Sequence, residues 1–264
     1  MRDAVAPSDR PEGFVQSFER GLAVIRSFSA EHPALTLSDV ARETGLTRAA
    51  ARRFLITLES LGYVESDGRT FTLTSRVLDL GYAYLSSSSL PDVLQRHLEV
   101  LANEAHENCS ASQLQGQDIV YIARASTSHI MTLGLAIGAH LPAYCTSMGR
   151  VLLAGLPDDE LDVFLETADL RRRTEHTVVS KDILRKKLEF VREHGYCLLD
   201  GELETGMRSV AVPIRGTDGS MLAAINMSVH ATRVSAHALE RELLPKLFGA
   251  QTAIETELRH LRTP

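Results

Sequence analysis

Residues 36–63 constrain the fold of this chain most, because they place two short helical patterns on either side of a glycine. Leu37, Val40 and Ala41 recur at i, i+3 and i+4, which predicts a short helix with a narrow apolar stripe. The small side chain of Ala41 suits a close crossing with a second helix. Gly45 can take positive φ, so we expect it to end the first helix and turn the chain.

The second helix begins after Thr47, whose hydroxyl can cap it. Its predicted buried face comprises Ala51, Phe54, Leu55 and Leu58. Its other face carries Arg48, Ala49 and Arg52, with Arg53 at the edge. Residues 44–58 contain three arginines and no acid. This pattern is typical of a helix-turn-helix DNA reader, and the alternative is an ordinary pair of helices with a solvated basic face.

A predicted two-stranded hairpin follows at once and favours the first alternative. Residues 62–65 read as a strand, Asp67-Gly68 as a hairpin turn and residues 70–73 as the return strand. A helix-turn-helix with such a hairpin is a winged helix. Arg69 would lie near the wing tip, where it can reach a phosphate or a minor groove; otherwise it is a plain exposed turn residue.

Composition excludes several classes of protein. The chain has 264 residues, enough for two domains, and a net charge of −6, which excludes a uniformly basic nucleic-acid coat but not a reader with one basic face. Cys109, Cys145 and Cys197 lie far apart without a CxxC motif, so we expect no zinc ribbon or disulfide framework. No apolar run reaches membrane-span length. A cytoplasmic protein that needs no cofactor or metal is expected.

Four regions are predicted along the chain. They are a disordered arm at 1–13, a winged helix-turn-helix domain at 14–74, a linker helix at 75–89 and a second domain at 90–264. A first helix at 14–30, with Phe18 on its inner face, should back the reader. The linker helix is too apolar for a bare connection, which suggests packing on a partner subunit. The serines at 86–89 mark the linker, and Pro91 opens the next helix.

The second domain alternates strands and helices. Strands are expected at 111–115, 119–124, 131–135, 196–200, 209–214 and 221–229. Helices are expected at 146–154, 158–166, 181–194 and 235–261, the last kinked or broken by Pro245. Glycine-containing turns between consecutive strands imply an antiparallel sheet. A sheet of this kind can hold a small molecule between its face and the covering loops.

The second domain lacks the usual catalytic motifs. There is no GxSxG, HExxH or phosphate-binding glycine loop, and the histidines show no ligand spacing. A thiol enzyme would need a base beside Cys145; His140 is near in sequence, but nothing orients it. We therefore predict no catalytic residue and no enzyme activity.

Polar groups at helix starts and strand ends predict a binding site instead. Residues 141–154 run from a loop into a helix whose N-terminus, around Ser147, can hold an anion. Asn226 and Ser228 alternate with apolar neighbours, so both should point to one face of their strand. That face either lines the site or is simply solvated.

Several stretches together resemble the IclR family of bacterial transcription regulators, from residue 14 to residue 261. They are 37–45 with Arg53-Phe54-Leu55, 62–64, 146–154, and Asp200 with 206–213. Residues 46–55, 121–126 and 141–154 are similar to the branch that includes PcaR, PcaU and PobR, which control protocatechuate, 4-hydroxybenzoate and β-ketoadipate catabolism. The resemblance implies an α+β chain in which a winged helix-turn-helix is joined by a dimerising linker helix to a GAF-like α/β effector-binding domain.

The resemblance also implies site residues. The expected DNA-binding residues are Ser38, Thr47, Arg48, Ala49, Ala50, Arg52, Arg53 and Arg69. The expected effector-binding residues are Arg124, Tyr144, Cys145, Thr146, Ser147, Met148, Gly149, Asp200, Arg208, Ser209, Asn226 and Ser228. Many members of the family have Ser where this chain has Asn226, and Ser or Thr where it has Ala49 and Ala50. Base readout would then rest on Arg48 and Arg52.

The implied function is a regulator that binds double-stranded operator DNA as a homodimer or a dimer of dimers, away from membranes, under control of a small carboxylate. The start of the helix at Ser147 would hold the carboxylate. Arg124, Arg150 or Arg208 would add positive charge, unless each forms a structural ion pair. Two alternatives stay open at this point: an enzyme on the second domain's sheet, and a DNA-binding scaffold without a ligand.

Overall fold

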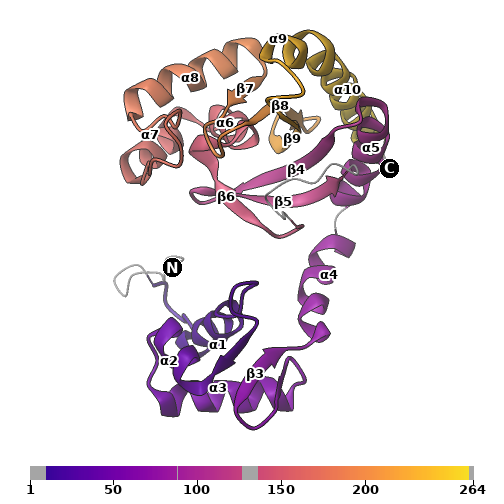
Figure 1. Cartoon of the computed structure of the whole chain (residues 1–264). Helices are drawn as coiled ribbons and strands as arrows, with labels where there is room; N and C mark the ends of the chain where they lie inside the picture. Colours follow the sequence, from indigo (N-terminus) through magenta and orange to yellow (C-terminus); the bar gives the residue numbers. More distant parts are fainter. Residues whose placement is uncertain (1–9, 88, 127–135, 262–264) are drawn as a thin grey trace. The chain divides into compact units, whose positions relative to one another are not determined.

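The computed structural model describes residues 10–87, 89–126 and 136–261, and the chain divides into two compact units, Met1–Ser87 and Ser88–Pro264 (Figure 1). In the described residues, the first unit combines four α-helices with a small sheet, and the second is built on a larger sheet. The predicted α+β class is confirmed. Of the predicted disordered arm, residues 1–9 lie outside the described residues, whereas Arg10 pairs with Glu19 at 3.0 Å.

The first unit contains the predicted helix-turn-helix. α1 (Gln16–Arg26) is followed by α2 (Leu37–Thr44) and α3 (Arg48–Ser60). Their inner faces form one core, with Val24, Val40, Ala41, Ala51 and Leu55 among its buried residues.

The turn between α2 and α3 is stabilised as the sequence predicts. Gly45 adopts φ 66° and ends α2, and the Thr47 hydroxyl accepts a hydrogen bond from the Ala50 N–H at 3.2 Å. A capping box, which we did not predict, starts α2: the Thr36 hydroxyl accepts from the Asp39 N–H, and the Asp39 carboxylate accepts from the Thr36 N–H. Both helix starts therefore have bonded amides, which stabilises the first turn of each helix.

The wing is a three-stranded antiparallel sheet rather than a two-stranded hairpin. β2 (Val64–Ser66) and β3 (Thr70–Leu73) are the predicted pair, and β1 (Ala34–Thr36) adds to the free side of β3. β1 was not predicted because three residues are too few to show an alternating pattern. Phe18, which we expected on the inner face of the first helix, is instead exposed: α1 contacts the core through Val24 near its end, and Phe28 joins the core just after the helix.

A helix follows the wing. After a short 3-10 turn (Ser75–Val77), α4 (Leu78–Ser87) carries exposed apolar side chains, with Leu78 72% and Tyr82 69% exposed. α4 ends at Ser87, inside the serine tract, and α5 (Ser89–Ala105) begins at the last serine of that tract. The boundary between the two compact units falls within this serine tract, between Ser87 and Ser88.

The second unit is a six-stranded antiparallel sheet in the order β6-β5-β4-β9-β8-β7. The strands are β4 (Asn108–Gln115), β5 (Asp118–Ala125), β6 (His140–Pro142), β7 (Cys197–Asp200), β8 (Met207–Arg215) and β9 (Met221–His230). The strand expected at 131–135 lies outside the described residues. β6 was not expected, because its three residues include a proline.

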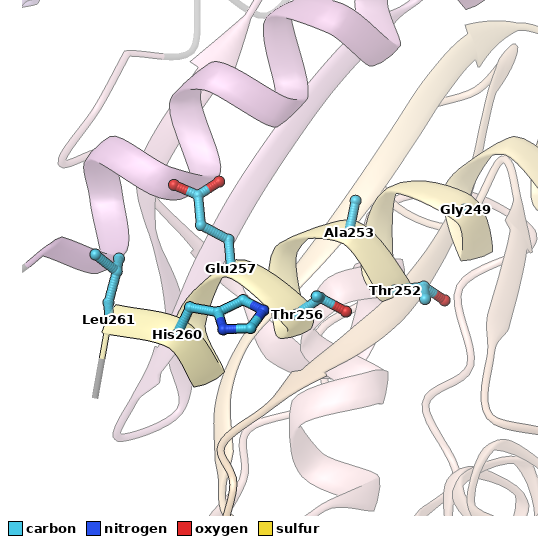
Figure 2. A pocket seen from close by; sticks show the side chains of 7 residues that line it. All are labelled: Gly249, Thr252, Ala253, Thr256, Glu257, His260 and Leu261. Atoms are coloured by element: carbon cyan, nitrogen blue, oxygen red, sulfur yellow. The ribbon is translucent and has the colours of Figure 1, made fainter. Parts of the chain in front are cut away.

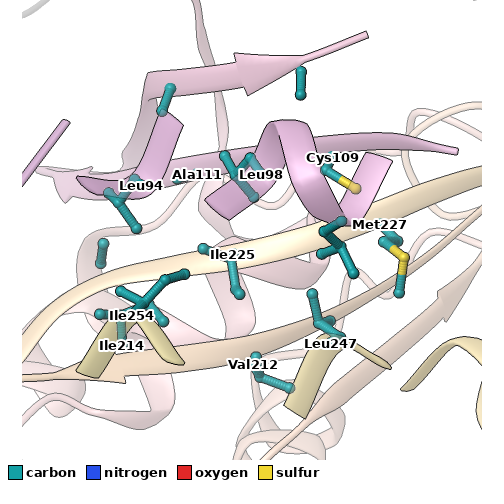
Figure 3. Close-up of a cluster of buried hydrophobic side chains, with 14 of the residues drawn as sticks. Leu94, Leu98, Cys109, Ala111, Val212, Ile214, Ile225, Met227, Leu247 and Ile254 are labelled. Atoms are coloured by element: carbon teal, nitrogen blue, oxygen red, sulfur yellow. The ribbon is translucent and has the colours of Figure 1, made fainter. Parts of the chain in front are cut away.

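Helices cover both faces of this sheet. α5 and α10 (Leu244–Leu261) cover one face, where alternate residues of β8 and β9 such as Val212 and Ile225 meet Leu98 and Leu247 (Figure 3). α6 (Ser147–Ala154), α7 (Asp158–Thr167) and α8 (Lys181–His194) cover the other face, against Ala211 and Ala224. The small residues on this second face allow α6 to approach the sheet closely.

The predicted C-terminal helix is interrupted, as Pro245 required. A short helix α9 (Ala236–Ala238) leads into a π-type turn, η4 (Leu239–Leu243), and α10 begins one residue before the proline. Proline removes a backbone donor and its ring crowds the carbonyl four residues earlier, which the wider turn relieves.

Candidate functional site

The exposed face of α3 is basic. Arg48, Ala49, Arg52 and Arg53 are exposed, and Ala50 is half-buried. No carboxylate among the described residues pairs with Arg48, Arg52 or Arg53, whereas arginines such as Arg42, Arg185 and Arg192 do form ion pairs. Ser38 is exposed on α2, and Thr47 is exposed at the α3 cap. This face therefore offers unneutralised guanidinium groups on a rigid helix, which suits phosphate and base-edge contacts.

The wing tip is held by Asp67. Its carboxylate accepts from the N–H groups of Arg69 at 2.8 Å and Thr70 at 2.6 Å, and Gly68 has φ 89°. The Thr70 N–H is the main reason that the pKa of Asp67 lies below its usual range. The tip is thus a preformed turn, and it leaves the Arg69 side chain exposed.

A cavity of the second unit lies between the start of α6, the strands and the loop after β7; its empty volume, open mouth included, is about 530 Å³. Eight of the predicted effector-binding residues line it: Cys145, Thr146, Ser147, Met148, Arg208, Ser209, Asn226 and Ser228. The lining residues that sequence reasoning missed are Tyr121, Leu199, Glu202, Leu203, Glu204 and Met207. Half of these, Glu202, Leu203 and Glu204, belong to the loop after β7, where the only signal was its position between two strands.

The start of α6 presents backbone donors to this cavity. Thr146 caps the helix: its hydroxyl accepts from the Gly149 N–H at 3.2 Å, and its carbonyl accepts from the Arg150 N–H at 3.0 Å. The N–H groups of Ser147 and Met148 precede the first intrahelical bonds, and they carry the positive end of the helix dipole. An anion placed here would meet oriented donors and favourable charge.

Two buried polar atoms of the cavity lining have no hydrogen-bond partner among the described residues: the Ser147 Oγ and the Asn226 Oδ1. The Asn226 Nδ2 donates to the Ser228 Oγ at 3.0 Å, so these two strand residues lie on the same face, as predicted. That face is the covered one, because Asn226 is only 5% exposed. Leaving such atoms unpaired costs about 1–3 kcal/mol each, which a bound polar ligand would recover.

Four predicted effector-binding residues lie outside the cavity lining. The Arg124 Nε donates to the Ser126 Oγ just after β5, and the Tyr144 hydroxyl donates to the Arg171 carbonyl at 2.6 Å. Asp200 is exposed and pairs with Arg208 at 2.8 Å. Gly149 is packed against backbone instead. The contacts of these four residues depend on partners that the sequence pattern did not indicate.

Gly149 allows α6 to begin where it does. A Cβ at this position would lie 2.2 Å from the Ala143 carbonyl oxygen and 2.5 Å from the Thr146 Oγ1. We expect Gly149→Ala to lower the free energy of unfolding by about 1–3 kcal/mol, because backbone has to move to relieve the overlap. Thermal unfolding measures this. Gly249→Ala, on the open face of α10 with nothing within 4 Å, is the matched control and should be neutral or stabilising by up to ~1 kcal/mol. Equal effects of the two changes would contradict the packing assigned to Gly149.

A buried ion pair joins Glu202 of the cavity lining to Arg150. The Arg150 Nη2 is 2.5 Å from the Glu202 Oε2, and the two side chains are 1% and 7% exposed. The Arg150 Nε also donates to the Tyr144 carbonyl at 2.8 Å, and the Glu202 Oε2 accepts from the Val178 N–H at 3.1 Å. Of the two readings that the sequence left open for Arg150, the structure places it in an ion pair. The pair ties α6 to the loop after β7.

The cavity does not suit nucleophilic or metal chemistry. Burial is the main cause that raises the pKa of the Cys145 thiol to about 11, so the thiolate is scarce near neutral pH. Among the described residues, no group of His, Cys, Asp or Glu is placed to hold a metal ion. None of the described helices is long and apolar enough to cross a membrane.

A second hollow follows the outer face of α10. Figure 2 shows it lined by residues of that helix, from Gly249 through Thr252, Ala253 and Thr256 to Leu261. It is shallow and mostly apolar, and no buried polar atom lacks a partner there among the described residues. The cavity beside α6 is therefore the stronger candidate for a ligand site.

Comparison with known proteins agrees with both halves of the structure. Residues 17–68 match the IclR helix-turn-helix domain, and residues 82–256 match the C-terminal domain of the bacterial transcriptional regulator IclR. The Pca regulon regulatory protein of Pseudomonas putida is 45% identical over 238 residues, which are 90% of this chain and 82% of that protein. Its name agrees with the predicted branch.

Two solved structures are also similar. The crystal structure of a transcriptional regulator from Rhodococcus sp. RHA1 is 55% identical, with a TM-score of 0.84 over 94% of this chain and all of that one. A double mutant of the PobR inducer-binding domain from Acinetobacter, in complex with 3-hydroxybenzoic acid, is 29% identical, with a TM-score of 0.60 over 64% of this chain and 98% of that one. The chain therefore belongs to the IclR family of bacterial transcriptional regulators, which bind DNA and are not enzymes.

Proposed function

We propose that this regulator binds a two-fold operator as a dimer, or as a dimer of dimers, and that a small carboxylate from aromatic-acid catabolism controls it. Protocatechuate, 4-hydroxybenzoate and β-ketoadipate are the candidate effectors. Support comes from the named relatives, one a regulator of the Pca regulon and one a domain in complex with 3-hydroxybenzoic acid.

The observation that carries the effector site is the pair of buried, unpartnered polar atoms beside the start of α6. Ser147 and Asn226 both line the cavity, and their Oγ and Oδ1 atoms lack partners among the described residues. Ser147 and Met148, whose N–H groups belong to the first turn of α6, line the same cavity. A carboxylate at the helix start would accept from these N–H groups and from the Ser147 hydroxyl.

Two helices, α3 and α4, support the proposal of a dimer. One recognition helix reads one half-site. A two-fold operator therefore requires two recognition helices, one from each subunit, about one helical turn of DNA apart. α4 exposes Leu78, Leu80 and Tyr82, an apolar surface that a second copy of the same helix would cover. The effector changes regulation only if it binds one arrangement of the dimer more tightly than the other.

Isothermal calorimetry on the full chain with the three candidate acids tests this function. We expect at least one of them to bind, and we expect Ser147→Ala to weaken it by about tenfold, because one hydrogen bond to a charged group is lost. Thr252→Ala on the outer face of α10 is the control and should leave the affinity unchanged. If no candidate acid binds, the effector belongs to another chemical class. Unchanged affinity in Ser147→Ala would place the carboxylate elsewhere.

A further inference from the structure

The cavity beside α6 is lined by more hydrogen-bond acceptors than an anion site requires. Glu202, Glu204 and Asn226 all line it, and each carries a side-chain oxygen that can accept a hydrogen bond; we call these three residues the acceptor wall. A carboxylate cannot satisfy an acceptor, because it has no hydrogen to donate. We propose that the effector carries a hydroxyl group besides a single carboxylate, and that the acceptor wall receives this hydroxyl; the proposal rests on the function proposed above.

Glu202 has one oxygen engaged and one available. Its Oε2 accepts from the Arg150 Nη2 at 2.5 Å and from the Val178 N–H at 3.1 Å, whereas its Oε1 has no hydrogen bond to any described residue. The side chain is held rigidly, because the hydroxyls of Thr174 and Thr177 also bond the backbone of its loop, at the Gly201 and Glu202 carbonyls. A hydroxyl that reaches Glu202 would meet a preorganised acceptor.

Glu204 adds a charge that nothing in the described part of the chain neutralises. Its side chain is half-buried and makes no hydrogen bond or ion pair with any described residue. The guanidinium of Arg208, which also lines the cavity, already pairs with another carboxylate: its Nε donates to Asp200, and its Nη1 donates to the carbonyls of Ala231 and Val234. The side of the cavity next to Glu204 therefore repels a carboxylate and accepts a neutral donor.

Asn226 favours the same ligand group. Its Nδ2 bonds Ser228 and its Oδ1 is unpaired; exchanging the two ends of the amide would leave the Nδ2 unpaired instead. A hydroxyl both donates and accepts, so it satisfies Asn226 in either orientation, whereas a carboxylate satisfies only one.

The cavity thus has positive potential at the start of α6 and hydrogen-bond acceptors at Glu202, Glu204 and Asn226. A hydroxybenzoate offers one group for each. Benzoate leaves the wall unpaired, and terephthalate replaces the hydroxyl with a second carboxylate that meets Glu204. β-Ketoadipate, with two carboxylates, is disfavoured for the same reason as terephthalate.

Calorimetry on the full chain with 4-hydroxybenzoate, protocatechuate, benzoate, terephthalate and β-ketoadipate tests the proposal. We expect a hydroxybenzoate to bind at least tenfold more tightly than benzoate and about 100-fold more tightly than either dicarboxylate. In Glu204→Gln the penalty for terephthalate should shrink at least tenfold, because the repelling charge is gone. Glu193→Gln, on the exposed surface of α8, should leave the ratio unchanged.

The outcomes separate the two proposals. If benzoate or terephthalate binds as tightly as the hydroxybenzoates, the hydroxyl requirement is overturned and the proposed aromatic-acid effector still stands. If β-ketoadipate alone does so, the hydroxyl requirement is also overturned, and only the proposal of a carboxylate effector still stands. The same terephthalate penalty in Glu204→Gln as in the wild type would remove Glu204 from the recognition. An absence of binding by all five acids would overturn the proposed effector, and with it this inference.

Discussion

Replacing Arg150 by methionine is expected to lower the free energy of unfolding by about 3–5 kcal/mol, because Glu202 would be left charged, buried and without its partner. The melting temperature should fall by on the order of 10 °C for a domain of this size. Differential scanning calorimetry of the full chain measures the change. The loss arises mainly from the unpaired charge, since methionine fills much of the space of the arginine stem.

A double variant and a surface variant isolate that cause. Arg150→Met combined with Glu202→Leu removes both charges, so it should recover much of the lost stability. Arg185→Met breaks an exposed pair with Asp162 and should cost about 0–1 kcal/mol. A double variant as unstable as Arg150→Met alone would show that the arginine acts through packing rather than through charge.

Arg52→Ala and Arg48→Ala are expected to weaken operator binding by about 1–3 kcal/mol each, equivalent to about 5–150-fold in Kd. Both side chains project from the exposed face of α3 without an ion-pair partner among the described residues. A guanidinium that reads a guanine edge loses both of its hydrogen bonds on truncation. Fluorescence anisotropy with operator and scrambled duplexes at fixed salt measures the change.

Two further variants define what the arginines do. Arg53→Ala, at the edge of the face, should weaken operator and scrambled duplex alike and reduce the salt dependence by about one counterion, as expected for a phosphate contact. Arg172→Ala, exposed in the second unit, is the charge-matched control and should change neither. Wild-type affinity in both Arg48→Ala and Arg52→Ala would exclude α3 as the reader.

The helix-turn-helix was predictable because its determinants are local. Gly45 and Thr47 act on their own backbone within one turn of helix, and the two amphipathic stripes need only each other and α1 to be buried. β1 escaped prediction because three residues become a strand only when β3 is already there to pair with them.

The cavity was predictable only in part. The alternation of Asn226 and Ser228 placed them on one face, but the sequence left open whether that face is solvated. α6 decides it by covering the sheet there, which buries Asn226. Glu202 and Glu204 gave no sign of their role, since a loop has no period that would indicate which side chains turn inward.

By itself, the sequence determined the family, through its matching stretches, and the α+β class and the reader, because helix and strand patterns and caps act between neighbours along the chain. Only the tertiary structure decided which polar groups share the cavity and that Arg150, 52 residues before Glu202, neutralises it. The reason is physical: charges and unpaired polar atoms interact according to distance and burial in space, and neither quantity follows from separation along the chain.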